Sequence, residues 1–389
     1  RLGRAQDDAH ARGLHGRHPW RQIVQLTTAV DDLLRDLVES IALVVTVVSI
    51  SALRPLAKSI GLVDRPGGRK SQTGLVPVIG GIGMFIGMIV GMAFLEATSN
   101  TLVILILSSF LLVLVGAVDD RYHLPSPLRI VVQIAVVFLM VYGANLGLYQ
   151  IGDPLGIGEI GLGPLSLIFT CCVTLTLINA YNLIDGVDGL AGTMALIALA
   201  AISLVGGVGS GSTTMALIAS AAIIGYLLFN FPAGFNRSVR SFMGDAGSTF
   251  LGFTIVWITL GITQGPERII SPVHCLWFAA IPIFDTFTCF VRRIAAGKSP
   301  FRPGRDHFHH TLKNGGMTGR QVLAILVLLQ FFYALVGVTG HFAGVQDAVM
   351  FAGWVLVGLT QRSVIAYVAT HRRASLLRRR ARYRLARSG

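Results

Sequence analysis

The sequence predicts an all-α, polytopic integral membrane protein with about eleven transmembrane helices. Hydrophobic residues make up 53% of the 389 residues, only 13% are charged, and the mean hydropathy is +0.68. This composition excludes an ordinary soluble domain and argues against a nucleic-acid partner. Apolar windows of about 20 residues recur, each long enough to cross the roughly 30 Å hydrocarbon core of a bilayer. The windows are 37–53, 76–96, 101–118, 129–148, 164–181, 190–207, 213–231, 246–264, 273–292, 321–340 and 346–368.

The connections between these windows fall into two classes by charge. Arg and Lys occur in the connections 54–75, 119–128, 232–245 and 293–320. They are absent from 97–100, 149–163, 208–212 and 341–345, and 265–272 carries Arg268 alone. The two classes alternate along the chain, so the positive-inside rule places the basic connections in the cytoplasm.

The charge pattern also divides the chain into three parts. Residues 1–36 mix both charges and are expected to form a poorly ordered N-terminal extension. Residues 37–368 form the transmembrane domain. Residues 369–389 form a polybasic cytoplasmic tail suited to anionic lipid. All four cysteines fall inside apolar windows, so we interpret them as packing residues rather than disulfides or metal ligands.

Carboxylates and amides gather where the basic-side connections meet the membrane. Asn182, Asp185 and Asp188 recur every three residues between two apolar windows, a spacing that places them on one face of a helical turn. Asp119 and Asp120 end the third window, where the helix macrodipole opposes them and they repel each other unless a cation lies nearby or one keeps a proton. Carboxylates at membrane depth are costly and usually functional.

A further carboxylate, Asp245, opens the eighth window in the segment Met243-Gly-Asp-Ala-Gly-Ser. It could be an ordinary helix N-cap, but its company with the other carboxylates favours a metal ligand. Oxygen ligands of this kind favour Mg²⁺ or Mn²⁺ over zinc. Asp285 lies within the ninth window, and we interpret it as structural support.

Two basic loops lie on the same side. In the first, Arg69 and Lys70 stand among glycines whose backbone amides could meet phosphate. The second carries a cluster of cationic and hydrogen-bonding side chains suited to a diphosphate: Arg302, Arg305, His307, His309 and His310. The spacing of the histidines, with no cysteine close to them in sequence, argues against zinc.

Together these residues predict metal-assisted transfer of a phosphoryl or phosphosugar group to a membrane lipid. The alternative from another class is a transporter of an anionic lipid or solute. Against it, the charges gather on one side of the membrane, and the sequence shows no inverted repeat of broken spans.

Five motifs in order, over roughly residues 54–340, resemble the polyprenyl-phosphate N-acetylhexosamine-1-phosphate transferase family. The carboxy-terminal half is most similar to the members that use undecaprenyl phosphate and UDP-GlcNAc. The resemblance implies that Asp245 is the principal Mg²⁺ ligand, helped by Asn182. It further implies that Asp119, supported by Asp120, deprotonates or orients the lipid phosphate. One departure is Gln72, where the family often has His.

The resemblance also implies a substrate pocket. Asp185 and Asp188 are similar to nucleotide-pocket residues, Phe242 to a ring that stacks on uracil, and Lys70 to a basic residue near the phosphates. The loop that clamps the sugar and diphosphate is represented by Arg305, His307, His309 and His310.

The expected reaction transfers GlcNAc-1-phosphate from UDP-GlcNAc to undecaprenyl phosphate and releases UMP. It would initiate lipid-linked surface polysaccharide synthesis at the bacterial inner membrane. The donor could instead be another UDP-N-acetylhexosamine or UDP-MurNAc-pentapeptide. One-step attack and a covalent aspartyl intermediate both fit the residues, and a homodimer stays open as the assembly state.

Overall fold

A computed structural model describes residues 19–64, 75–94, 100–207, 210–232, 240–266, 268–297 and 307–388, with side chains described between 33 and 375. The chain divides into two compact units, Arg1–Val38 and Glu39–Gly389. In the first unit the described residues 19–38 are helical. The candidate site and all the candidate membrane spans but the first, Leu33–Ser59, lie wholly in the second unit.

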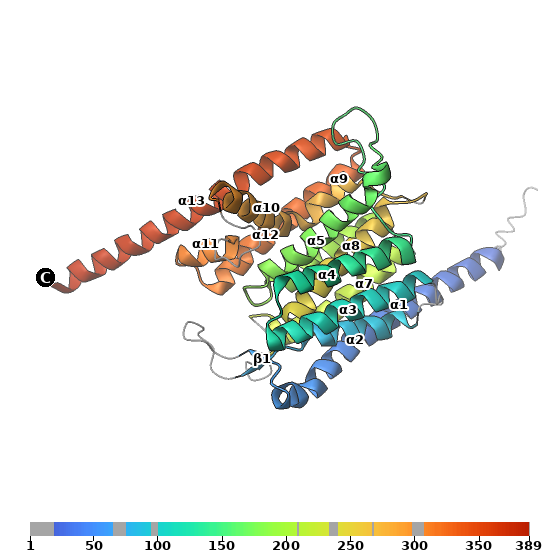
Figure 1. The fold of residues 1–389 in the computed structure, drawn as a ribbon, viewed down its shortest axis with the longest axis horizontal. Coiled ribbons are helices and arrows are strands. Elements are labelled where there is room, and N and C mark those ends of the chain that lie inside the picture. The colour runs from blue at the N-terminus through green and yellow to red at the C-terminus, as the bar shows by residue number, and fades with distance from the viewer. Residues whose placement is uncertain are drawn as a thin grey trace, which may run out of the picture. The chain divides into compact units, whose positions relative to one another are not determined.

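Besides helices and loops, the described residues contain one small antiparallel sheet, in which β1 (Val63–Asp64) pairs with β2 (Val76–Pro77). Figure 1 shows the order of the elements. The helices are α1 (Pro19–Ser59), α2 (Gly80–Met92), α3 (Asn100–Tyr122), α4 (Ser126–Phe138), α5 (Ser166–Ile184), α6 (Leu190–Gly206), α7 (Gly211–Asn230), α8 (Gly244–Thr263), α9 (Pro272–Cys275), α10 (Ala280–Ala295), α11 (Phe308–Asn314), α12 (Gly319–Phe342) and α13 (Asp347–Ser388). Short π and 3-10 turns extend α4 (Leu139–Gly143), precede α5 (Gly163–Leu165) and join α9 to α10 (Leu276–Ala279).

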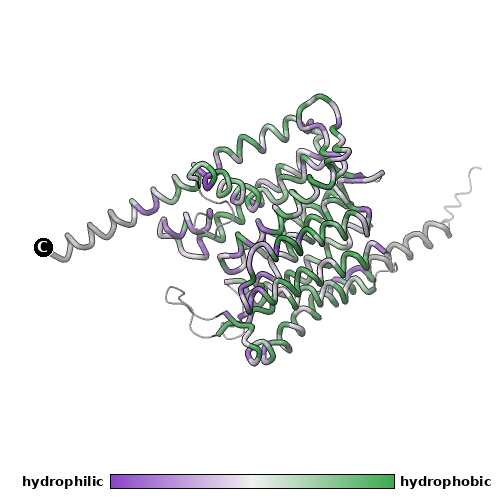
Figure 2. Tube along the Cα trace, viewed as in Figure 1, coloured by the Kyte–Doolittle hydropathy of each residue, from purple (hydrophilic) through white to green (hydrophobic). Residues whose placement is uncertain are grey.

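Nine helical segments of the described chain are long and apolar enough to cross a membrane, which confirms an all-α polytopic membrane protein. Their apolar character runs along most of each helix, and polar residues gather near the ends (Figure 2). Shorter apolar helices, α2 with 13 residues and α6 with 17, occupy two more predicted windows. At 1.5 Å per residue, α2 extends only about 20 Å, less than the hydrocarbon core.

Helix α8 is the centre of the bundle. Its apolar window is 89% buried, against 17% for α13, and it packs against α2, α3, α5, α6 and α7. Because α8 begins at Gly244, the first-turn residue Asp245 lies where these helices meet. Asp245 of the predicted site is thus carried by α8, the most buried of the candidate membrane spans.

The helices approach α8 through glycines. A Cβ added at Gly81 of α2 would lie 2.2 Å from the backbone nitrogen of Gly247, and one at Gly116 of α3 would lie 2.4 Å from that of Ala246. Small residues allow helix backbones to come this close in a membrane, where lipid is as apolar as the side chains and close packing drives association. The ends of α2 and α3 are therefore fixed against the first turn of α8.

The connections gather at two ends of the bundle, as the charge pattern predicted. At the end without the basic connections, the Asp347 carboxylate accepts hydrogen bonds from the backbone of Asp153 at 2.8 Å and from the Ser271 hydroxyl at 2.6 Å. It also lies 3.3 Å from Nδ1 of His274. These contacts join the loop before α5, the start of α9 and the start of α13. The assignment of the basic end to the cytoplasm stays a prediction.

We expect Gly116→Ala to lower the free energy of unfolding by about 1–3 kcal/mol. The new Cβ would overlap the backbone of α8, which cannot move aside as a flexible side chain would. Thermal unfolding of the detergent-purified protein measures the change. Gly211→Ala is the matched control, because a Cβ at the start of α7 meets nothing within 4 Å. Equal stability of the two variants would contradict close packing at Gly116.

Candidate functional site

A cleft of about 1490 Å³ opens at the end of the bundle where the basic connections meet. Segments far apart in sequence line it, and each of the four basic connections contributes. The cleft brings together the following predicted site residues: Asp119, Asp120, Asn182, Asp185, Asp188, Phe242, Asp245 and His310. Residues predicted from separate motifs therefore share one solvent-open space at the end of the membrane helices.

Asp120 holds the end of α3 to the start of α8. Its carboxylate accepts hydrogen bonds from the backbone nitrogens of Asp245 at 2.9 Å and Ala246 at 3.3 Å. Amides in the first turn of a helix have no partner within the helix, and the positive end of the macrodipole attracts an anion. Gly244, with φ +70°, allows the approach, since a Cβ there would lie 2.3 Å from Oδ2 of Asp120. Asp120 thus places Asp245 beside Asp119.

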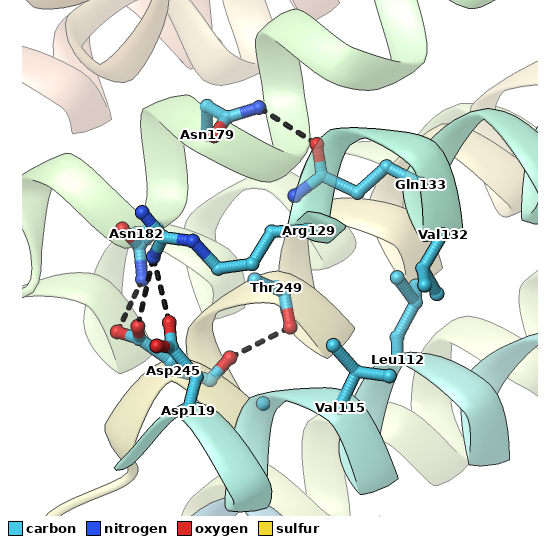
Figure 3. Close-up of a pocket in the computed structure, with 11 residues that line it drawn as sticks. Leu112, Val115, Asp119, Arg129, Val132, Gln133, Asn179, Asn182, Asp245 and Thr249 are labelled. Atoms are coloured by element: carbon cyan, nitrogen blue, oxygen red, sulfur yellow. Dashed lines mark hydrogen bonds and ion pairs between the residues drawn. The ribbon is translucent and has the colours of Figure 1, made fainter. Parts of the chain in front are cut away.

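Asp119 is buried and fully engaged. Its Oδ1 accepts a hydrogen bond from the backbone of Leu124 at 2.6 Å, and its Oδ2 accepts one from Nη1 of Arg129 at 2.7 Å. The same Nη1 lies 3.2 Å from Oδ2 of Asp245 (Figure 3). Sequence analysis missed Arg129. The available signal was a single arginine at the edge of an apolar window, ten residues after Asp119.

Asn182 completes the surroundings of Asp245. Its amide nitrogen donates to Oδ1 of Asp245 at 2.7 Å and to the Ser248 hydroxyl at 3.0 Å. One turn back on α5, Asn179 donates to the buried Gln133 of α4 at 3.0 Å (Figure 3). The predicted helical face is only partly correct: α5 ends at Ile184, so Asp185 and Asp188 lie in the turn that follows it, while Asn182 remains on the helix and points at α8.

The donor set fits the predicted divalent cation. Burial, followed by the charges of Asp245, Asp120 and Asp188, raises the pKa of Asp185 to about 8. A partly buried group of neighbouring carboxylates suits a hard cation with oxygen ligands. Asp245, Asp185 and Asn182 supply carboxylate and amide oxygens of the kind that Mg²⁺ binds. The metal itself and the ligand role of each residue stay predictions.

A second ion pair lies on the side of the cleft predicted for the nucleotide. Arg240 pairs with Asp188, and its guanidinium carbon lies 6.0 Å from the ring centre of Phe242. The backbone of Phe242 donates to Pro77 of β2 at 3.0 Å. Phe242 is thus held by the small sheet on one side and flanked by Arg240 on the other. Sequence analysis missed Arg240, whose partner lies 52 residues away.

Asp285 organises the histidine loop from inside the bundle. Its Oδ1 accepts a hydrogen bond from the backbone of Phe308 at 2.8 Å, and its Oδ2 lies 3.1 Å from Nδ1 of His307. These contacts support the interpretation of Asp285 as structural, because they fix the start of α11. Cys289, interpreted as a packing residue, is a buried free cysteine, and its sulfur also lies 3.5 Å from Nδ1 of His307. Cys289 and His307 are 18 positions apart in sequence, so no local pattern predicts this contact.

The histidines differ in charge. Burial alone would lower the pKa of His307, but hydrogen bonds to Asp285 and Cys289 and the negative charge of Asp285 outweigh it and raise that pKa to about 9. Burial, with the positive charges of His310, Lys313 and His307, lowers the pKa of His309 to about 3. At neutral pH, His307 is therefore an imidazolium and His309 is neutral.

Helix α11 docks on the turn that follows α5. The imidazole of His309 packs closely on Gly186, since a Cβ added at Gly186 would lie only 2.2 Å from Nε2 of His309. Lys313 donates a hydrogen bond to the Gly186 carbonyl at 2.8 Å. His310, whose ring centre lies 4.2 Å from that of His309, lines the cleft. The described part of the histidine loop thus contacts the turn that carries Asp185. Lys70, Gln72, Arg302 and Arg305 lie outside the described residues, so their roles stay predictions.

Comparison with known proteins shows what kind of protein has this site. Residues 102–263 match the family model described as Glycosyl transferase family 4. The chain is also 36% identical over 293 residues, 75% of its length, to the undecaprenyl-phosphate alpha-N-acetylglucosaminyl 1-phosphate transferase of Escherichia coli O157:H7, of which 79% is covered. The chain therefore belongs to the family of the undecaprenyl-phosphate alpha-N-acetylglucosaminyl 1-phosphate transferases.

Further relatives agree. The proteins of the same name from Yersinia pestis and Pasteurella multocida are each 36% identical to the chain. The Yersinia match spans 317 residues, 81% of this chain and 85% of the relative. The Pasteurella match spans 309 residues, 78% of this chain and 86% of the relative. The resemblance predicted from the motifs is confirmed, and the transporter alternative gains no support.

We expect stability to fall as the pH rises from about 6.5 to about 9, because of the ion pair between His307 and Asp285. Below this range His307 is protonated in both the folded and the unfolded chain. Within it only the folded chain keeps the proton, and above it neither does. The pair therefore contributes on the order of 2–3 kcal/mol at the acid end, and this contribution is lost at the alkaline end.

Thermal unfolding across this pH range measures the effect, with Asp285→Asn as the matched variant. The asparagine can still accept the hydrogen bond from Phe308 but has no charge to hold the proton on His307. Asp285→Asn should be less stable than the wild type near pH 6.5 and should show a flatter pH dependence. An unchanged pH dependence in Asp285→Asn would show that this ion pair is not its source.

Proposed function

We propose that this protein transfers GlcNAc-1-phosphate from UDP-GlcNAc to undecaprenyl phosphate, giving undecaprenyl-diphosphate-GlcNAc and UMP. It would act at the bacterial inner membrane, with the cleft facing the cytoplasm, and initiate a lipid-linked surface polysaccharide. The observation that carries the proposal is the convergence of Asp119, Asp120, Asp185 and Asp245 in one cleft, in a chain 36% identical to transferases named for this reaction. A cleft at the end of membrane helices admits both a water-soluble nucleotide sugar and a lipid headgroup.

In the proposed reaction, an oxygen of the lipid phosphate attacks the β-phosphorus of UDP-GlcNAc. A new P–O bond forms as the bond between the β-phosphorus and the bridging oxygen breaks, and UMP leaves with that oxygen. Asp119 is placed to orient the attacking phosphate or accept its proton, since hydrogen bonds from Leu124 and Arg129 hold its carboxylate in a fixed direction. Positioning and charge stabilisation account for most of the catalysis in transfers of this kind.

The proposed ion would be held by Asp245 and Asn182, with Asp185 nearby, and Mg²⁺ or Mn²⁺ suits these donors. When bound, it supplies charge neutralisation for the diphosphate and for the departing UMP. The protein's own part is to hold Asp245 in place through the hydrogen bonds from Asn182 and Thr249 to its carboxylate and its backbone carbonyl (Figure 3).

The nucleotide sugar would bind along the opposite side of the cleft. Phe242 stacks on uracil in this proposal, and Asp185 and Asp188 contact the nucleoside. In this proposal the cleft-lining His310 contacts the diphosphate. His307 and His309, predicted for the same role, are buried and do not line the cleft, so they would act by holding α11 in place. Lys70, Arg302 and Arg305 are proposed to add positive charge at the diphosphate.

The lipid would approach from the bilayer between α3 and α4. Leu112 and Val115 of α3 and Val132 of α4 line a small cavity that ends at Asp119 and Arg129 (Figure 3). The cavity itself is only about 20 Å³, so in this proposal the polyprenyl chain stays in the bilayer and only its phosphate comes to Asp119 and Arg129.

We expect label from radioactive UDP-GlcNAc to enter the organic phase when the detergent-solubilised protein, undecaprenyl phosphate and Mg²⁺ are mixed, and to stay in water when EDTA replaces Mg²⁺. Asp245→Asn should lower the rate by about a hundredfold or more, because it weakens stabilisation of charge that develops in the transition state. Asp153→Asn at the opposite end of the bundle is the control and should retain wild-type rate. Organic extraction and counting measure transfer without any sealed compartment.

Each result of this assay decides a different part of the proposal. Full activity of Asp245→Asn would contradict the metal assignment. Transfer from another UDP-N-acetylhexosamine or from UDP-MurNAc-pentapeptide, and not from UDP-GlcNAc, would change the donor and keep the reaction. Absence of transfer from every UDP-sugar with folded protein would overturn the transferase function.

We expect Phe242→Ala to raise the KM for UDP-GlcNAc by about tenfold, since stacking of a base on an aromatic ring contributes about 1–3 kcal/mol. The KM for undecaprenyl phosphate should stay unchanged, because Phe242 lies on the nucleotide side of the cleft. Phe242→Tyr, which keeps the ring, is the control and should resemble the wild type. Equal increases in both KM values would show that the substitution disturbs the whole cleft.

A further inference from the structure

Arg129 occupies a position that ordinary helix energetics disfavour. Helix α4 begins at Ser126 after Pro125, so Arg129 lies in its first turn, where the positive end of the macrodipole repels a cation. Its guanidinium is compensated by carboxylates from two other helices: Nη1 lies 2.7 Å from Oδ2 of Asp119 and 3.2 Å from Oδ2 of Asp245. These anions explain why an arginine is stable at this point.

Because Arg129 contacts both Asp119 and Asp245, it would compete with a metal ion for the Asp245 carboxylate. Arg129 and Asn182 together engage both oxygens of Asp245. A divalent cation bound to Asp245 would face the guanidinium at short range, and like charges at such a distance repel. Arg129 therefore takes the place that a cation could occupy, since it neutralises part of the paired negative charge of Asp119 and Asp245.

The Arg129 side chain is only partly enclosed by the protein. Its side chain is 33% exposed, and it borders the cavity between α3, α4 and α5, of about 20 Å³. Leu112 and Val115 form one wall of this cavity, and the hydrogen-bonded pair Gln133 and Asn179 lies on another (Figure 3). On the proposed path of the lipid, this is where its phosphate would arrive.

We propose that Arg129 is a positioning residue that exchanges partners, from Asp245 in the metal-free site to the phosphate of the incoming lipid when a divalent cation binds Asp245. The inference rests on the proposed function. Its consequence is that metal and lipid phosphate bind cooperatively: the lipid draws Arg129 from Asp245 and so favours the metal, and by linkage the metal favours the lipid by the same factor. A static structural ion pair would produce no such coupling.

The test measures Mn²⁺ binding to the full-length, detergent-purified protein by electron paramagnetic resonance, without nucleotide sugar. It is done with and without a short-chain polyprenyl monophosphate such as farnesyl phosphate. In the wild type, we expect the lipid phosphate to lower the Kd for Mn²⁺ by about tenfold. In Arg129→Gln, Mn²⁺ should bind about tenfold more tightly than to the wild type without lipid, and the lipid phosphate should change its Kd little.

Two further variants keep the result interpretable. Arg268→Gln removes an arginine from the ion pair with Glu159 at the opposite end of the bundle and should behave as the wild type. Arg129→Lys keeps the charge but loses the planar fork that lets arginine engage two anions, so its Mn²⁺ affinity without lipid should lie between those of the wild type and Arg129→Gln. Thermal unfolding establishes that each variant is folded.

The outcomes separate this inference from the proposed function. Wild-type affinity and wild-type coupling in Arg129→Gln, or in Arg129→Lys if the glutamine variant does not fold, would overturn the exchange of partners and leave the transferase function intact. Absence of Mn²⁺ binding to the wild type, with and without lipid, would overturn the metal assignment and the inference together. Activity supplies a second readout: Arg129→Gln should raise the KM for undecaprenyl phosphate and leave that for UDP-GlcNAc unchanged.

Discussion

The hydrogen bonds between the Asp120 carboxylate and the first turn of α8 are the contact on which the site depends. They satisfy two amides, those of Asp245 and Ala246, at the most buried helix of the bundle. Glycines make the contact sterically possible, because Gly116 and Gly244 leave no Cβ between the two backbones. Since Asp119 precedes Asp120 directly, the same contact sets the distance between Asp119 and Asp245. The carboxylates of the candidate site are therefore positioned by helix capping within the core.

Electrostatics explains how so many charges share one end of a membrane bundle. Most of the carboxylates have a compensating group: Arg129 for Asp119 and Asp245, Arg240 for Asp188, helix amides for Asp120 and the imidazolium of His307 for Asp285. Asp185 has no such cation among the contacts described, and its pKa is raised to about 8. A site built this way has negative charge to offer a cation and positive charge to offer phosphates. It is suited to bringing two phosphorylated substrates together.

The histidine loop shows how a distant part of the chain joins this site. Asp285 holds the start of α11 from within the bundle, while His309 and Lys313 contact Gly186 in the turn after α5. A glycine is required there because any side chain would overlap the imidazole of His309. The turn that carries Asp185 and the helix that carries His310 are thereby locked to each other, which gives the nucleotide side of the cleft a defined wall.

Hydropathy located the apolar helices, because a span needs only local apolar length, and charge alternation predicted which connections share an end. Only the structure decided that two of the eleven windows hold the shorter helices α2 and α6. The motif residues, from Asp119 to Asp245, were also identifiable, since carboxylates at membrane depth are rare and costly. What only the tertiary structure decided is how they pair. Arg129 meets a partner 116 residues away, and Cys289 meets a histidine 18 residues away. No local pattern encodes such contacts, because helix packing through glycines, rather than sequence spacing, brings the side chains within hydrogen-bond distance.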